Sequence, residues 1–171
     1  MQRLVCDVVA EWARKRLEWR PRKRSESLTA PPLLQLLVLG TADTGKTHTA
    51  KVSRRKVRRM LGRFDSVLPL TFSSVAAANL GGGSRTIDSI FHTNVDEAQY
   101  DLVGEQLDKL VEELRHVELL LIDGISTVGA AQLEIVNRRL QQVARVLHRE
   151  RFGTEPPEDM GSFGGIGQDT L

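Results

Sequence analysis

Eight residues in the first third of the chain combine glycine, lysine and threonine at a spacing that can hold phosphate. They are Gly40, Thr41, Ala42, Asp43, Thr44, Gly45, Lys46 and Thr47, and they fit the P-loop pattern G-x-x-x-x-G-K-[ST]. In such a loop, backbone N–H groups and the start of the next helix surround a phosphate chain. We therefore predict that Lys46 binds the terminal phosphates of a nucleotide and that Thr47 binds Mg²⁺. A glycine-rich turn that fits the pattern by accident is the alternative.

A second stretch could supply the carboxylate that Mg²⁺ needs beside a P-loop. Leu119 to Ile122 are apolar and Asp123 follows them, a pattern typical of a central parallel strand with both faces covered. We predict that Asp123 binds Mg²⁺ directly or through water; the alternative is that it caps the turn after the strand. Hydrolysis also needs a base or water-positioning group beside the metal, and Gly124, the next residue, has no side chain to supply one.

The spacing of apolar residues indicates which elements would position these groups. Apolar runs predict strands over Leu33–Leu39, Val67–Phe72 and 119–123. Apolar residues at intervals of three and four predict helices over residues 2–19, 46–61, 101–117 and 131–148, with shorter helical stretches after Ser73 and over 86–92. The alternation of strands and helices predicts an α/β fold with a parallel sheet flanked by helices. The strand before Gly40 should lead the chain directly into the P-loop.

Composition divides the chain into three segments. Residues 1–30 contain an amphipathic helix and the basic stretch Arg20–Arg24, which we interpret as an exposed linker. A nuclear-localisation or nucleic-acid-binding patch is the alternative. Residues 31–152 form the predicted nucleotide-binding domain, and residues 153–171 form a tail rich in glycine and proline. A chain of 171 residues with 40% hydrophobic content is long enough for one such core.

Cysteine content and hydropathy exclude several classes of protein. Cys6 is the single cysteine, so no internal disulfide can form, and no Cys/His cluster has the spacing of a zinc site. No apolar run reaches the ~18 residues that a membrane span needs, and the N-terminus lacks the core of a secretory signal. We therefore expect an intracellular protein, with the nucleus or the mitochondrion as the compartments that fit.

Charge is distributed unevenly although the net charge is only +2. Residues 1–64 contain 16 Lys and Arg against 5 Asp and Glu, whereas residues 65–171 contain 8 against 17. The basic part is a candidate for binding a polyanion besides the nucleotide. A solvated basic face without a partner is the alternative.

Five stretches resemble, in order, successive motifs of the Pif-one-like ATP-dependent DNA helicases and their Helitron-type relatives. They are residues Gly40–Thr47, Val75–Gly82, Thr86–Phe91, Leu119–Ser126 and Phe163–Ile166. The resemblance covers most of residues 36–166. It implies a RecA-like ATPase domain that uses ATP and Mg²⁺ and, paired with a second motor domain, moves along single-stranded DNA and unwinds duplexes in the 5′-to-3′ direction. The family's functions lie in DNA repair, recombination and telomere maintenance.

The resemblance also implies roles for individual residues. Lys46 and Asp123 would be catalytic, Lys46 binding the β- and γ-phosphates and Asp123 holding Mg²⁺ together with Thr47. Gln2 resembles the glutamine that reads adenine in this family. The residues implied to contact the DNA backbone are Ser73, Ser74, Asn79 and Ser89.

Five positions depart from the family pattern. Gly124 replaces the glutamate that usually follows the strand aspartate, and Asp43 stands where glycine is usual. Ser73-Ser74 replaces Thr-Gly, and Asp88 replaces a histidine before Ser89. The missing glutamate removes the catalytic carboxylate, so we expect hydrolysis to be severely weakened or absent.

The family pattern also continues beyond the end of this chain. After Gly165-Ile166 it proceeds to a strand that bears a glutamine and to a second motor domain, whereas this chain reads Gly167 to Leu171. We therefore expect an N-terminal motor-domain fragment whose RecA-like sheet is incomplete at its C-terminal end. The second motor domain would belong to the intact parent.

Three functional hypotheses follow. The first is an ATP-dependent DNA helicase motor with ATP·Mg²⁺ and single-stranded DNA as ligands. The second is a non-catalytic nucleotide-binding or nucleic-acid-binding module derived from a helicase. The third, a small P-loop kinase, leaves Val75–Gly82 unexplained, and nothing in the sequence resembles a lid or an acceptor site.

Overall fold

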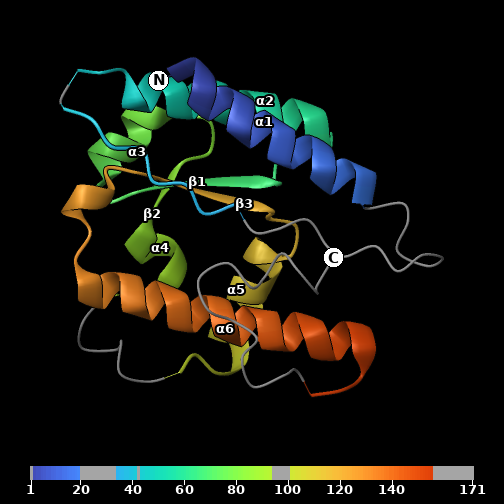
Figure 1. Ribbon diagram of the computed structural model, residues 1–171. Coiled ribbons are helices and arrows are strands. Elements are labelled where there is room, and N and C mark those ends of the chain that lie inside the picture. The colour runs from blue at the N-terminus through green and yellow to red at the C-terminus, as the bar shows by residue number, and fades with distance from the viewer. Residues whose placement is uncertain (1, 20–33, 42, 94–100, 156–171) are drawn as a thin grey trace.

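The computed structural model describes residues 2–19, 34–41, 43–93 and 101–155. Helices lie on both sides of a small sheet (Figure 1). In chain order the elements are α1 (Gln2–Trp19), α2 (Lys46–Leu61), β1 (Val67–Thr71), α3 (Ser74–Leu80), β2 (Arg85–Thr86), α4 (Ile87–Phe91), α5 (Gly104–Leu114), β3 (Leu119–Asp123), the 3₁₀ turn η2 (Ile125–Thr127) and α6 (Ala130–Phe152).

The three strands of the described residues form one parallel sheet. β1 lies between β2 and β3, and all its residues are buried, as expected for a middle parallel strand. The register pairs Val67 with Leu119 and Thr71 with Asp123. Asp123 therefore ends β3 at the carboxyl edge of the sheet, which is the edge where α/β folds place their ligands.

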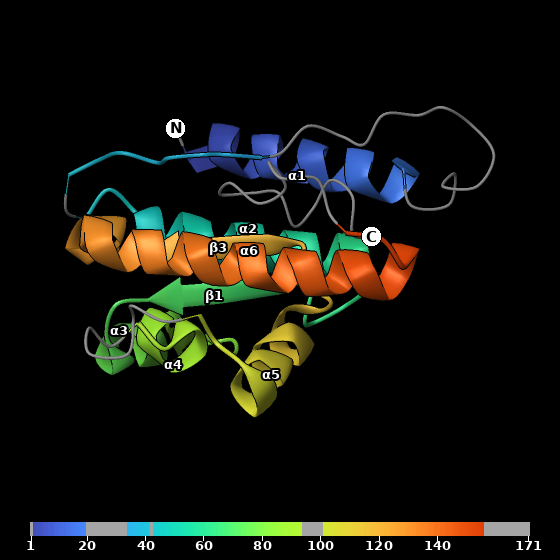
Figure 2. The same ribbon diagram turned by 90° about the horizontal axis from the view of Figure 1, so that it is seen from below.

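The side chains of β1 and β3 alternate between two layers of helices. Val67, Leu119 and Leu121 face α1 and α2, whereas Leu68 and Leu70 join the apolar residues of α4, α5 and α6. Figure 1 shows α1 and α2 on one side of the sheet and α4, α5 and α6 on the other, and Figure 2 shows that α1 lies alongside α2. The sheet is the middle layer, and each face has its own apolar cluster.

The predicted α/β class is confirmed: a parallel sheet is flanked by helices, consistent with an incomplete RecA-like P-loop fold. The helices predicted over residues 2–19, 46–61 and 86–92 are present, and the one predicted after Ser73 is α3. The helix predicted over 101–117 is shorter, and the one predicted over 131–148 continues to Phe152. The strand β2 was not predicted, because two residues give no periodic signal.

The strand predicted before the P-loop is wrong. Residues 34–41 contain no strand, and Leu36, Leu37 and Leu39 are 44%, 64% and 70% exposed. Leu34 does pack against the cluster beneath α1. An apolar run becomes a strand only where a neighbouring strand pairs with it, and this run pairs with no strand of the described sheet.

The central position predicted for the strand at 119–123 is also wrong for the described sheet. β3 lies at one edge of the order β2-β1-β3, and its residues are half-buried. The apolar run correctly located a strand, but it did not reveal how many neighbours that strand has, because packing against helices alone covers both faces of β3.

α1 packs along α2 and joins it to the sheet (Figure 1). Val9 and Ala13 of α1 are buried at this contact. One turn further, Nε of Arg16 donates to Oε2 of Glu118 at 3.1 Å, and the two side chains are 3% and 1% exposed. Burial lowers the pKa of Arg16 to about 10, which is still above neutral pH. The guanidinium therefore remains charged inside the protein and depends on the Glu118 carboxylate.

The predicted division into residues 1–30, 31–152 and 153–171 stays a prediction. The basic stretch Arg20–Arg24 lies outside the described residues, as does the motif Phe163–Ile166. Within the described part of the chain, no helix combines the length and the apolar character that crossing a membrane requires.

The buried ion pair between α1 and the residue before β3 gives a test of this arrangement. Glu118→Ala leaves the Arg16 guanidinium buried without its carboxylate, so we expect a loss of about 3–5 kcal/mol in the free energy of unfolding. Urea denaturation followed by circular dichroism measures this loss. The matched control is Glu18→Ala on the same helix, because Glu18 pairs with Arg14 at an exposed site, and its removal should cost less than ~1 kcal/mol. If both variants lose the same small amount of the free energy of unfolding, the proposed role of the buried pair of Arg16 and Glu118 is contradicted.

Candidate nucleotide-binding site

The P-loop residues form a tight turn that leads into α2. Gly45 precedes the helix with φ of 78°, and its carbonyl accepts the N–H of Thr49 at 2.9 Å. Asp43 also has a left-handed backbone, with φ of 58°. A residue with a Cβ adopts that conformation at a cost of ~1 kcal/mol, whereas glycine adopts it freely. The aspartate therefore occupies a position whose backbone favours glycine. Ala42, which was also predicted to bind nucleotide, lies outside the described residues.

The ammonium group of Lys46 lies against the carbonyl oxygens of its own loop. Nζ donates to the carbonyls of Gly40 at 2.7 Å and Thr41 at 2.5 Å, and to Oγ1 of Thr44 at 3.4 Å. The hydroxyl of Thr44 donates in turn to the Thr41 carbonyl at 2.8 Å. These acceptors are uncharged, so phosphate oxygens would make stronger, charge-assisted hydrogen bonds with the same ammonium group. Lys46 is thus held at the mouth of the loop by bonds that an anion can replace.

Thr47 and Asp123 meet directly, although 76 residues separate them. The hydroxyl of Thr47 donates to Oδ2 of Asp123 at 2.8 Å. Two elements make this contact possible: α2 presents Thr47 in its first turn, and the pairing of β1 with β3 brings Asp123 to the carboxyl edge of the sheet. A hydroxyl and a carboxylate therefore lie side by side next to the phosphate-binding loop.

The donor set at this point fits Mg²⁺ held together with a nucleotide. Mg²⁺ prefers oxygen ligands, and it is usually bound through one or two protein groups, with phosphate oxygens and water completing the octahedron. Thr47 and Asp123 provide such groups. Elsewhere in the described residues no group of three or more His, Cys, Asp or Glu side chains could hold a metal ion without a nucleotide.

Gly124 has a left-handed backbone with φ of 76° and begins the turn η2. Its carbonyl accepts the N–H of Thr127 at 2.9 Å and the hydroxyl of the same residue at 2.7 Å. A Cβ on Gly124 would contact only Oγ1 of Thr127, at 3.7 Å. The space around Gly124 would therefore accommodate a side chain, but its backbone conformation opposes one.

Gln2 of α1 reaches the P-loop. Its Nε2 donates to the carbonyl of Thr44 at 2.9 Å, and a Cβ added to Gly45 would lie only 2.2 Å from the same nitrogen. The start of α1 therefore lies directly on the loop, and the glycine at this position makes the close approach possible. Residues from three parts of the chain, α1, the P-loop with α2, and β3, meet at the site.

The residues predicted to contact DNA lie on two other helices and are exposed. Ser73 and Ser74 lie at the start of α3, where Oγ of Ser73 accepts the N–H of Ala76 at 3.2 Å and caps the helix. Asn79 lies in the last turn of α3. Ser89 of α4 donates its hydroxyl to the carbonyl of Thr86 at 2.9 Å. These four residues are not part of the nucleotide site.

One feature of α2 was not predicted from the sequence. Arg54, only 5% exposed, donates to the carbonyls of Leu80 and Gly81 that follow α3, and Arg58 donates to the carbonyl of Gly82 at 2.8 Å. The spacing of four residues indicated that these two arginines share a face of the helix. Nothing in the sequence showed that this face points toward the glycine loop rather than toward solvent.

Comparison with known proteins identifies one family. The family model described as PIF1-like helicase matches residues 28–157, which include the P-loop, α3, α4, β3 and α6. No curated protein and no solved structure matches the chain significantly.

The backbone of Gly124 gives a test of the site's geometry. Gly124→Ala should lower the free energy of unfolding by about 1 kcal/mol, because alanine is strained at a positive φ. Chemical denaturation measures this change. The control is Gly129→Ser: Gly129 precedes α6 with φ of −70°, where serine can cap the helix, so no loss is expected. A Gly124→Ala variant as stable as the parent would show that the left-handed turn after Asp123 is not required.

Proposed function

The chain belongs to the PIF1-like helicase family, and we propose that its P-loop domain binds ATP together with Mg²⁺ and contacts single-stranded DNA as part of a helicase motor. The family makes ATP-dependent helicase chemistry the general expectation.

The hydrogen bond between Thr47 and Asp123 is the observation that supports nucleotide binding most strongly. Side chains from the start of α2 and the end of β3 converge at 2.8 Å, and both are oxygen ligands of the kind Mg²⁺ takes beside a P-loop. Without a carboxylate opposite the threonine, only the sequence pattern of the P-loop would support nucleotide binding. The contact of Asp123 with Thr47 supports the proposal independently of that pattern.

Each residue of the site has a proposed role. Lys46 exchanges its bonds to loop carbonyls for bonds to the β- and γ-phosphates, and the N–H groups at the start of α2 bind the same phosphates. Thr47 and Asp123 hold Mg²⁺, which neutralises phosphate charge. Gln2, whose amide donates to the Thr44 carbonyl of the loop, is proposed to contact the base.

We further propose that the chain binds ATP better than it hydrolyses it. A carboxylate next to Asp123 would orient or deprotonate the attacking water, but Gly124 has no side chain, and its φ of 76° disfavours one. Asp43 adds a negative charge and a strained backbone to the phosphate-binding turn. A second motor domain is the proposed partner that completes the cleft in which hydrolysis is coupled to movement.

DNA contact is proposed for the exposed hydroxyls and the amide at the two ends of α3 and on α4: Ser73, Ser74, Asn79 and Ser89. Hydroxyl and backbone N–H groups bind phosphodiesters without regard to sequence, as a motor that moves along any strand requires. Roles in DNA repair, recombination or telomere maintenance, a nuclear or mitochondrial location, and a Helitron-type relationship belong to the same proposal.

A second candidate function is a non-catalytic nucleotide- or nucleic-acid-binding module. It is favoured by the same glycine after Asp123 and by the segment before the P-loop, which forms no strand in residues 34–41 and exposes three leucines. The two candidates share nucleotide binding and differ in turnover. Binding and hydrolysis must therefore be measured separately.

Nucleotide binding can be measured by titrating the full chain with a fluorescent ATP analogue in the presence and absence of Mg²⁺. We expect Lys46→Ala to weaken binding at least tenfold, because charge-assisted hydrogen bonds contribute about 1.5–3 kcal/mol each. Asp123→Asn should remove most of the Mg²⁺ dependence. Lys109→Ala is the matched control, since Lys109 is an exposed cation of α5 paired with Glu105, and it should bind like the parent. Equal affinities of all variants for the ATP analogue would contradict the proposed nucleotide-binding site.

Hydrolysis can be followed by phosphate release from the same protein with and without oligo(dT). We expect no release above that of Lys46→Ala, which defines the background, because the chain lacks the carboxylate beside Asp123. Turnover of about 1 s⁻¹ or faster, in the ordinary range of enzymes, that is stimulated by DNA and lost in Lys46→Ala would contradict the impaired-hydrolysis proposal. That result would leave nucleotide binding intact.

A further inference from the structure

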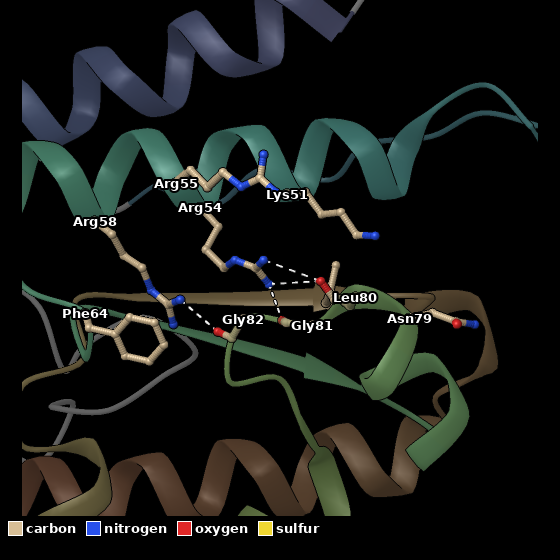
Figure 3. A pocket seen from close by; sticks show the side chains of 9 residues that line it. All are labelled: Lys51, Arg54, Arg55, Arg58, Phe64, Asn79, Leu80, Gly81 and Gly82. Carbon is tan, nitrogen blue, oxygen red and sulfur yellow. Dashed lines mark hydrogen bonds between the residues drawn. The ribbon is translucent and has the colours of Figure 1, made fainter.

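A cationic pocket lies on the flank of α2, facing the loop that follows α3 (Figure 3). Its volume is about 530 Å³, which is in the range of ligand-binding sites. Phe64 and the segment from Asn79 to Gly82 form one wall. The other wall consists of four basic side chains of α2: Lys51, Arg54, Arg55 and Arg58.

Arg54 is the most buried of the four cations, and the glycine loop is built around it. Its Nη1 donates to the carbonyl of Gly81 at 2.6 Å, and both Nη1 and Nη2 lie 3.4 Å from the carbonyl of Leu80. Gly82, with φ of 66°, passes so close that a Cβ there would lie 2.4 Å from Nη2. Only glycine allows this approach, so the loop geometry and the buried guanidinium depend on each other.

Arg58 and Phe64 form a flat surface at one end of the pocket (Figure 3). The guanidinium carbon of Arg58 lies 3.8 Å from the centroid of the Phe64 ring. Arg58 is held there because it also donates to the carbonyls of Gly82 at 2.8 Å and Val67 at 2.7 Å. The phenylalanine side chain nevertheless remains 65% exposed. An exposed aromatic ring beside cations is the usual platform for stacking an unpaired base.

The positive charge of the pocket is not neutralised by carboxylates of the described residues. The hydrogen bonds of Arg54 and Arg58 end on carbonyls or on the hydroxyl of Ser84, and no described ion pair includes any of the four cations. Burial, and then the charge of Arg55, lower the pKa of Arg54. Burial followed by the charge of Arg54 lowers the pKa of Arg58, against a smaller opposing effect of Asp65. A bound anion would relieve this repulsion.

The spacing of the cations favours a strand over a single phosphate. Lys51 and Arg58 are seven residues apart, which is about 10 Å along a helix. Lys51 and Arg55 make no side-chain hydrogen bond to the described residues, and in Figure 3 neither takes part in the bonds that join α2 to the loop. The pocket therefore combines two cations that are fixed by the backbone, two that are available, and one exposed ring.

We propose that this pocket binds single-stranded nucleic acid, with phosphodiester groups against Lys51 and Arg55 and a base on Phe64. This inference rests on the proposed function and adds a second contact surface to it. Ser73 and Ser74 lie at the start of α3, and the pocket lies at its end, where Asn79 belongs to both sets of residues. A strand bound at both ends of α3 would follow the helix along its length.

The test is fluorescence anisotropy with labelled oligo(dT) and the full chain over a range of salt concentrations. The variant Lys51→Glu/Arg55→Glu should bind at least tenfold more weakly, and the slope of log K against log salt should become smaller in magnitude by about 1.4, the value for two lost phosphate contacts on a single strand. Phe64→Ala should bind about tenfold more weakly, as expected for one lost stacking contact.

The matched control is Lys109→Glu/Arg145→Glu, which makes the same change in charge on α5 and α6, in the layer across the sheet from α2. It should retain most of the parent's affinity and slope. Equal losses in the control and the pocket variant would overturn the inference, since they would reflect net charge alone. Displacement of the oligonucleotide by inorganic phosphate at constant ionic strength, with no effect of Phe64→Ala, would overturn it in favour of a free-phosphate site.

Titration of the same preparations with the fluorescent ATP analogue separates this inference from the proposed function. Normal ATP·Mg²⁺ affinity in Lys51→Glu/Arg55→Glu, together with weak DNA binding, supports the pocket as a DNA site and shows that the variant is folded. If the parent chain binds ATP·Mg²⁺ but binds no oligonucleotide at low salt, the inference that the pocket binds DNA is overturned. The proposed nucleotide site is not affected by that result.

Discussion

The contact between Thr47 and Asp123 depends on the pairing of two strands, and the proposed nucleotide site depends on that contact. β1 and β3 pair in parallel over five residues, ending with Thr71 opposite Asp123, and β1 is buried between its neighbours. A shift of one residue in this register would turn Asp123 to the other face of the sheet. The apolar side chains that alternate between the two layers therefore fix the position of a carboxylate that itself takes no part in the core.

α2 combines functions that usually belong to separate elements. Its first turn carries Lys46 and Thr47, its middle carries the cations of the pocket, and its apolar positions hold α1 against the sheet. α1 is connected to the sheet independently by the buried pair of Arg16 and Glu118, and it places Gln2 on the loop. α2 thus supports the proposed nucleotide site, the proposed DNA pocket and the N-terminal helix α1. A change in the position of α2 would affect all three.

The sequence was most informative where a local pattern is sufficient. Helical periodicity located α1, α2 and α6, and two short motifs predicted that Thr47 and Asp123 lie beside each other at a P-loop. The failures concern long-range partners. Residues 34–41 are apolar but form no strand, because strand formation depends on a neighbour that periodicity does not reveal. The positive φ of Gly124 and the hydrogen bonds of Arg54 to a distant loop also depend on tertiary structure.

We propose above all that Thr47 and Asp123 jointly hold the metal of a bound nucleotide. Paramagnetic line broadening in the ¹⁵N–¹H spectrum of the full chain, on addition of Mn²⁺ with ADP, tests this most directly, because broadening falls off steeply with distance from the ion. We expect the amide signals of the P-loop and those around Asp123 to broaden together at low Mn²⁺, and we expect Asp123→Asn to abolish this joint effect. Broadening confined to other parts of the chain, or unchanged in Asp123→Asn, would contradict it.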